Sequence, residues 1–146
     1  TFVRANSEAL GIGRTFKFDV HVHVPQGAIP KDGPSAGLTI GVALASAASG
    51  RPVRQDVAMT GEVTLRGKVI GVGGVRDKVL AASRAGMKTV VLPEENRADL
   101  DDLPDSVRES LDIHLVRDMF QALDVALLTD SRGLAVAYTH DPFVEH

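Results

Sequence analysis

A tight loop that runs directly into an apolar segment is the feature that most constrains how this chain folds. Residues 30–37 read PKDGPSAG, and the segment after them is rich in Ala, Leu and Ile, which predicts a helix packed in the interior. Backbone N–H groups in the first turn of a helix lack intrahelical partners and carry the positive end of the helix dipole. Ser35 stands at this junction. Its hydroxyl is therefore either a helix cap or a nucleophile beside a ready-made oxyanion site.

The composition indicates one globular domain and argues against several classes of partner. The 146 residues are 44% hydrophobic, which is enough for a core, and the net charge of -3 argues against nucleic acid and anionic membranes. No apolar run approaches the ~20 residues that span a bilayer, and no signal-peptide pattern opens the chain. The absence of cysteine excludes disulfides and suits the cytoplasmic location that we expect. Since the chain begins at Thr1 rather than Met, we expect a fragment or a processed product.

Helical and extended patterns alternate along the chain without repeats. They predict a mixed α+β fold, a compact single domain over residues 1–128 with small mixed sheets flanked by helices, followed by a flexible tail over 129–146. We expect helices at 1–10, 35–49, 75–85 and 118–128, and strands at 16–24, 57–65, 68–72, 88–92 and 112–116. Arg66 and Gly67 join two of these strands in a plausible hairpin.

A nucleophilic serine needs an adjacent base, and the histidines are the first candidates. His21 and His23 share one face of the expected strand 16–24, a spacing that could also hold a metal. Polar residues on the wetter face of a strand need no such role, and no third ligand is placed, so we expect no metal site. His114 lies on a short strand far along the chain. No histidine has a catalytic motif around it.

Lysine is the other possible base. On the expected helix 75–85, the normal helical pitch places Lys78 on a stripe of small apolar residues, namely Val75, Ala81, Ala82 and Ala85. A lysine has a pKa of about 10.4 in water, and burial on such a face lowers the pKa because it disfavours the ammonium form. Spacing alone favours the alternative in which Lys78 extends past the alanines to water.

Four segments of the chain resemble the proteolytic domain of Lon proteases of the A type. They are HVHVPQGAIPKDGPSAG at 21–37, VAMTGEVTLRGKV at 57–69, GGVRDKVLAASRAGMKTVVLPEEN at 73–96 and DLDDLP at 99–104. The resemblance extends from about residue 16 to residue 128, in order and without large gaps. It implies the Lon proteolytic-domain fold and the activity of a serine endopeptidase.

The resemblance also implies roles for individual residues. Ser35 corresponds to the nucleophile, Lys78 to the general base of a Ser–Lys dyad, and Thr60 to the residue that orients the lysine. Arg76 and Asp77 replace a lysine and a glutamate of the family motif, but they keep the sign of each charge and leave the dyad lysine in place.

The remaining site predictions concern support and charge stabilisation. Asp32 is a loop carboxylate that is expected to support the turn, with a third triad member as the alternative role. Glu62 and His21 also match family positions and are expected to be supporting residues. Pro34 has no N–H, so the candidate oxyanion donors are the backbone amides of Gly33, Ser35, Ala36 and Gly37.

The resemblance further implies unfolded or damaged polypeptides as substrates and a hexameric ring of identical chains. Lon proteases of this type couple proteolysis to a preceding ATPase module. This chain has no Walker motif, so we expect no cofactor in this domain and assign ATP and Mg²⁺ to that other module. Two alternatives remain: an ATP-independent Lon-like peptidase, and a non-catalytic anion-binding or assembly module of the same fold.

Overall fold

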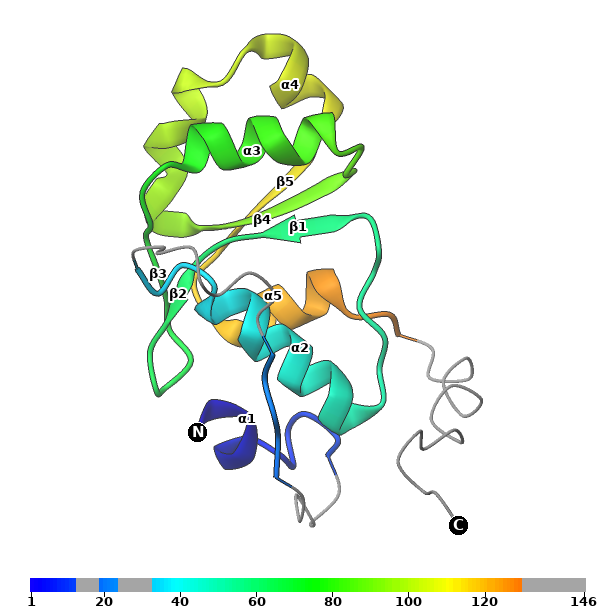
Figure 1. Cartoon of the computed structure of the whole chain (residues 1–146). Helices are drawn as coiled ribbons and strands as arrows, with labels where there is room; N and C mark the ends of the chain where they lie inside the picture. The colour runs from blue at the N-terminus through cyan, green and yellow to red at the C-terminus, as the bar shows by residue number, and fades with distance from the viewer. Residues whose placement is uncertain (13–18, 24–32, 130–146) are drawn as a thin grey trace.

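The computed structural model describes residues 1–12, 19–23 and 33–129 (Figure 1). Its helices are α1 (Phe2–Ala5), α2 (Gly37–Ser49), α3 (Val75–Arg84), the 3₁₀-helix η1 (Glu94–Asp102), α4 (Asp105–Ser110) and α5 (Met119–Ala126). Its strands are β1 (Val57–Met59), β2 (Glu62–Val63), β3 (Val69–Ile70), β4 (Thr89–Pro93) and β5 (Asp112–Val116). None of the helices in these ranges is long and apolar enough to cross a membrane.

A three-stranded parallel sheet with the order β1-β4-β5 lies at the centre. Every residue of β4 is buried, as expected for a parallel strand covered on both faces. Val91 packs into a core with α2 and α5, whereas Val90 and Leu92 pack into a second core with α3. Figure 1 shows these helices on opposite sides of the sheet. The predicted mixed α+β fold is confirmed.

The strand expected over 57–65 is in fact two strands that belong to different sheets. β1 pairs in parallel with β4, and β2 pairs with β3 in an antiparallel hairpin. The break falls at Thr60 and Gly61, where a Cβ on Gly61 would lie 3.2 Å from both Leu38 and Val69. The expectation of one strand is wrong because β1 pairs with β4, which is distant in the sequence, and local alternation does not reveal such a partner. The hairpin turn at Arg66 and Gly67 is confirmed, with Gly67 at φ 86°.

The strand expected over 16–24 is described only at 19–23, and these residues form no strand. Val20 and Val22, expected on a buried face, are 47% and 48% exposed. An alternating segment forms a strand only where a neighbouring strand accepts and donates its backbone hydrogen bonds. No strand pairing is found for residues 19–23. The other residues of that prediction, and 130–146 of the expected tail, lie outside the described residues.

The helix predictions succeed for α2, α3 and α5 and fail at the start of the chain and between residues 93 and 111. Helices α2, α3 and α5 lie within their predicted ranges, and α2 ends at Gly50 in the left-handed conformation. The helix expected over 1–10 is reduced to α1, because residues 6–11 form turns instead. No helix or strand was predicted between residues 93 and 111, where η1 and α4 form.

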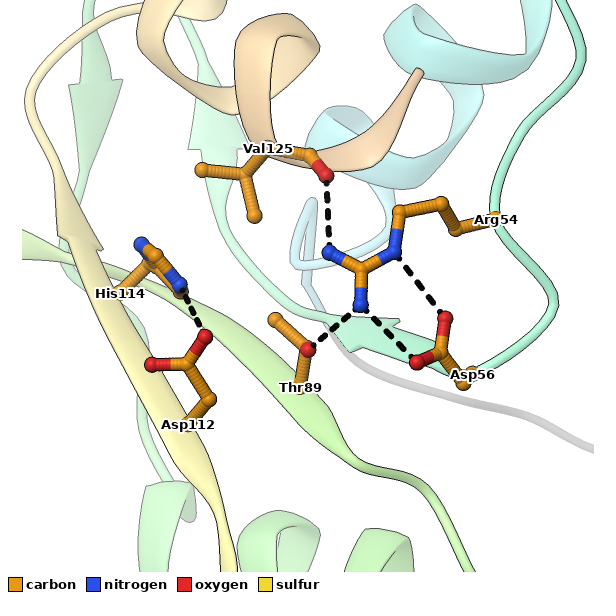
Figure 2. A network of polar contacts seen from close by, with 6 residues as sticks. All are labelled: Arg54, Asp56, Thr89, Asp112, His114 and Val125. Carbon is orange, nitrogen blue, oxygen red and sulfur yellow. Dashed lines mark hydrogen bonds and ion pairs between the residues drawn. The ribbon is translucent and has the colours of Figure 1, made fainter. Parts of the chain in front are cut away.

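Arg54 joins the start of β1 to the end of α5 (Figure 2). Its guanidinium donates to both carboxylate oxygens of Asp56 at 3.1 and 2.9 Å, to Thr89 Oγ1 at 3.0 Å and to the Val125 carbonyl at 3.4 Å. Its backbone N–H donates to the Ala126 carbonyl at 2.8 Å. The hydrogen bonds from Arg54 hold the pKa of the Asp56 carboxyl below its usual range.

This lowered pKa predicts a pH-dependent contribution to stability. The Asp56 carboxylate stabilises the fold fully above its unfolded pKa of about 3.9, and the contribution is lost as the pH falls through the lower folded value. The Asp56→Asn variant is therefore expected to unfold at less urea than the wild type at pH 7, with a difference that narrows below about pH 4. Asp101→Asn on η1 is the surface control. A difference of equal size at pH 7 and pH 2 would contradict the role given to Asp56.

Candidate active site

Ser35 lies immediately before α2, and its backbone ties this helix to the break between β1 and β2. The Ser35 carbonyl accepts hydrogen bonds from the Gly61 N–H at 3.0 Å and from Thr60 Oγ1 at 3.3 Å. The Leu38 N–H donates to the Gly61 carbonyl at 2.9 Å. The N-cap residue of α2 is Ala36, and no side chain caps the helix. The Ser35 hydroxyl is therefore not the cap of α2.

Gly37 allows this close approach of the helix to the hairpin. It is the first residue of α2, and a Cβ on it would lie 3.2 Å from the Val63 nitrogen and 3.7 Å from the Gly61 carbonyl oxygen. The neighbouring atoms are backbone, which cannot swing aside. A glycine at this position therefore lets the start of α2 pack directly on β2 and holds Ser35 beside Thr60.

Thr60 connects Ser35 to Lys78. The Lys78 Nζ donates to Thr60 Oγ1 at 3.2 Å, and Thr60 Oγ1 donates to the Ser35 carbonyl at 3.3 Å. A hydroxyl has one hydrogen, so Thr60 accepts from Lys78 and donates to Ser35. Thr60 is itself buried, with 7% of its surface exposed. The three segments that carry the predicted nucleophile, base and orienting residue thus meet at one place.

The stripe of small apolar residues expected around Lys78 is only partly buried. Lys78, Ala81 and Ala85 are all exposed, and the buried face of α3 consists of Val75, Val79 and Ala82. Lys78 therefore lies at the edge of the apolar face, and its exposure agrees with the alternative that spacing alone favoured. The helical projection grouped the right side chains, but only part of the stripe faces the sheet.

Ser35, Thr60 and Lys78 line a cavity of about 330 Å³. The rest of its wall is largely apolar and comes from α2, β1, α3 and β4; it consists of Ala36, Thr39, Ala58, Met59, Val79, Ala82, Val90 and Leu92. A hydroxyl and an amine thus share a hollow large enough for part of a substrate chain.

No histidine or acidic residue is among the described residues that line this cavity. His21 and His23 line a separate hollow against α2, which shares only Ala36 and Thr39 with the first. His114 lies on β5, where its Nε2 is 2.7 Å from an Asp112 carboxylate oxygen (Figure 2). Within the ranges that the structure describes, no three His, Asp or Glu side chains are grouped to hold a metal ion.

The remaining predicted residues are only partly placed. Glu62 begins β2, where it pairs with Ile70. Asp32 lies outside the described residues. Among the candidate oxyanion donors, the Gly37 N–H donates to the Pro34 carbonyl at 2.9 Å, so this amide has a partner inside the loop. The amides of Gly33, Ser35 and Ala36 are the better candidates.

Thr39 is a residue of this site that the sequence analysis did not single out. It lies one helical turn after Ser35, and its Oγ1 donates to the Met59 carbonyl at 3.4 Å. It therefore ties the first turn of α2 to the end of β1 and contributes to the cavity wall. The signal available in the sequence was a polar residue four positions after Ser35 in a largely apolar helix.

Comparison with known protein families shows the family to which this chain belongs. The family model described as the Lon protease (S16) C-terminal proteolytic domain matches residues 1–129. The chain belongs to the Lon protease family. The match includes Ser35, Thr60 and Lys78, and it confirms the resemblance drawn from the four sequence segments.

Individual Lon proteases are similar over most of the chain. The Lon protease of Escherichia coli K12 is 54% identical over 138 residues, which are 93% of this chain and 18% of that protein. Lon protease 1 of Sorangium cellulosum is 57% identical over 125 residues, 84% of this chain and 15% of that protein. The Lon protease of Heliobacterium modesticaldum is 56% identical over 130 residues, 88% of this chain and 16% of that protein. The chain thus spans less than a fifth of the length of these Lon proteases.

Proposed function

We propose that this chain is a serine endopeptidase domain in which Ser35 is the nucleophile and Lys78 the general base. The observation that carries the proposal is the connection from the Lys78 Nζ through Thr60 Oγ1 to the backbone of Ser35, beside a cavity that all three residues line. Membership of the Lon protease family supports it. A hydroxyl beside an amine is a known arrangement for acyl transfer.

In the first half of the reaction, the Ser35 oxygen attacks the carbonyl carbon of a peptide bond while the neutral Lys78 amine takes the hydroxyl proton. The developing oxyanion needs fixed N–H donors, for which the amides of Gly33, Ser35 and Ala36 are candidates. The C–N bond then breaks, the leaving amine takes the proton back from Lys78, and an ester with Ser35 remains. In the second half, water attacks the carbonyl carbon of the ester and gives a proton to Lys78; as the C–O bond to Ser35 breaks, Lys78 passes that proton to the Ser35 oxygen and becomes neutral again.

Thr60 is assigned the role of holding the two partners in position. Its hydroxyl accepts a hydrogen bond from the Lys78 Nζ and donates one to the Ser35 carbonyl. This carbonyl also accepts a hydrogen bond from the Gly61 N–H. The segments that carry the nucleophile and the base are therefore both held by Thr60, which is buried between β1 and β2. Such preorganisation lowers the entropy that is lost on reaching the reactive geometry.

The substrates proposed for this site are unfolded polypeptides. The chain has no Walker motif, so any use of ATP and Mg²⁺ is proposed for an ATPase module elsewhere in a longer protein. A hexameric ring and a cytoplasmic location are likewise proposed for that protein. The isolated chain is then expected to cleave unstructured peptides without nucleotide and to leave folded proteins intact.

Hydrolysis of an unstructured fluorogenic peptide tests this proposal. The wild-type chain is expected to cleave it without nucleotide, and Thr60→Val is expected to lower kcat by about 10- to 100-fold, because valine keeps the shape but loses both hydrogen bonds. Thr60→Ser restores a hydroxyl and is expected to retain most of the rate. Thr64→Val, on the β2–β3 hairpin, is the matched control. Absence of cleavage by the wild type, or an unchanged rate in Thr60→Val, would argue against the proposal.

A further inference from the structure

Two side chains at the start of η1 hold the linker between β3 and α3. A Glu95 carboxylate oxygen accepts from the Gly71 N–H at 2.8 Å. Asn96 Oδ1 accepts from the Val72 N–H at 3.0 Å, and Asn96 Nδ2 donates to the Val72 carbonyl at 2.8 Å. The Asn96 amide therefore pairs with both backbone groups of one residue, much as a neighbouring strand would.

The contact between Asn96 and Val72 is closely fitted. Asn96 is 7% exposed, and its Nδ2 donates a second hydrogen bond to Asp99 Oδ2 at 2.8 Å, so both amide hydrogens are used. A Cβ on Gly71 would lie 3.3 Å from Glu95 Cβ and 3.4 Å from Asn96 Oδ1. The absence of a side chain at residue 71 thus allows η1 to approach this linker. We call the paired Asn96 and Val72 the linker clamp.

The linker clamp lies just ahead of the helix that carries Lys78. Gly74, two residues after Val72, is the N-cap of α3 with φ 68°, and its carbonyl accepts from the Lys78 N–H at 3.2 Å. Val75 follows and is 1% exposed. The position of Val72 therefore sets where the first turn of α3 begins. Lys78 is on that turn.

We propose that Asn96 is a positioning residue for Lys78. By holding the backbone of Val72, it sets the start of α3 and hence the distance from the Lys78 amine to Thr60 and Ser35. This inference rests on the proposed Ser–Lys chemistry. Asn96 is not among the described residues that line the cavity, and its side-chain hydrogen bonds go to Val72 and Asp99, so its effect on the reaction passes through the helix.

The test is the rate at which a fluorophosphonate labels Ser35, followed by mass spectrometry across a range of pH. Asn96→Asp removes the donor to the Val72 carbonyl and places a carboxylate beside Asp99. A shift of about 1 Å in a catalytic group costs on the order of 100-fold, so the labelling rate is expected to fall by about 10- to 100-fold. The pH at which the rate is half-maximal is expected to move, because the surroundings of the Lys78 amine change. With a peptide substrate, kcat is expected to fall and KM to change little.

A second variant separates positioning from simple stability. In Asn96→Asp combined with Asp99→Asn, the carboxylate at residue 96 faces an amide instead of a second carboxylate, so the thermal stability is expected to recover. The Val72 carbonyl still lacks its donor. The labelling rate of this double variant is therefore expected to stay low. Asn6→Asp is the matched control, because it also removes a bond from an amide to a backbone carbonyl, that of Phe2 at 2.9 Å. It is expected to label at the wild-type rate.

The outcomes distinguish this inference from the function on which it rests. If the double variant labels at the wild-type rate with the wild-type pH profile, Asn96 serves only stability and the inference is wrong. If the wild type is not labelled at Ser35, or Lys78→Arg is labelled as fast as the wild type, the proposed dyad itself is wrong. The positioning role is supported if the double variant is stable but is labelled slowly, while the wild type and the Asn6→Asp control are labelled fast.

Discussion

Replacing Ser35 with alanine is expected to abolish peptide hydrolysis while leaving the fold intact. The substitution removes the attacking oxygen, and loss of a catalytic serine costs roughly 10⁴- to 10⁶-fold in kcat. The fold is expected to survive because the contacts that Ser35 makes to Thr60 and Gly61 use its backbone carbonyl, which alanine retains. Helix α2 is not capped by a side chain, so no capping energy is lost. Peptide hydrolysis and circular dichroism, measured on the same preparation, check both statements.

Ser49→Ala is the control for the Ser35 variant, because it makes the same chemical change at the other end of α2. It is expected to hydrolyse the peptide at the wild-type rate. Activity in Ser35→Ala within a few-fold of the wild type would remove Ser35 from the mechanism. A loss of activity accompanied by unfolding would contradict the claim that only the carbonyl of Ser35 supports the structure.

The second large effect is expected for Lys78→Arg. Arginine keeps the positive charge and can still donate to Thr60, but a guanidinium is not deprotonated in proteins and cannot accept the serine proton. General-base catalysis contributes about 10²- to 10⁴-fold, so kcat is expected to fall by that order. The wild-type rate is expected to rise with pH, because only the neutral amine accepts a proton. The variant is expected to show no such rise.

Lys88→Arg, just before β4, is the matched control and is expected to keep the wild-type rate and pH profile. A Lys78→Arg variant with nearly wild-type kcat would show that charge alone is required at this position. Lys78 would then bind substrate or hold Thr60, and another group would have to take the proton.

The sequence predicted the elements whose signals are local. The apolar segment after the loop, the periodicity of 75–85 and the apolar run of 88–92 correspond to α2, α3 and β4. It did not predict the break at Thr60 and Gly61, because the alternation of 57–65 continues through it while the partner strand changes from β4 to β3. Pairing with β4 brings together residues about 30 positions apart, which no local pattern encodes.

The site was predicted in a similarly uneven way. The loop identified Ser35, and family resemblance selected Lys78 and Thr60, which the structure brings together. The helical projection overstated the extent of the apolar stripe, because only Val75, Val79 and Ala82 of α3 are buried, whereas the exposure of Lys78 agrees with the alternative that spacing favoured. Asn96 was not singled out because it lies in a charged segment without helical periodicity. Its partner, Val72, is 24 residues away.

Mass spectrometry after treatment with a fluorophosphonate tests the central claim most directly, since the reagent forms a bond with an activated serine oxygen. A single adduct on Ser35 is expected in the wild type, and its loss is expected in Lys78→Arg. An adduct on a different serine, or equal labelling of Ser35 in both proteins, would contradict the assignment of Ser35 and Lys78 as a catalytic pair.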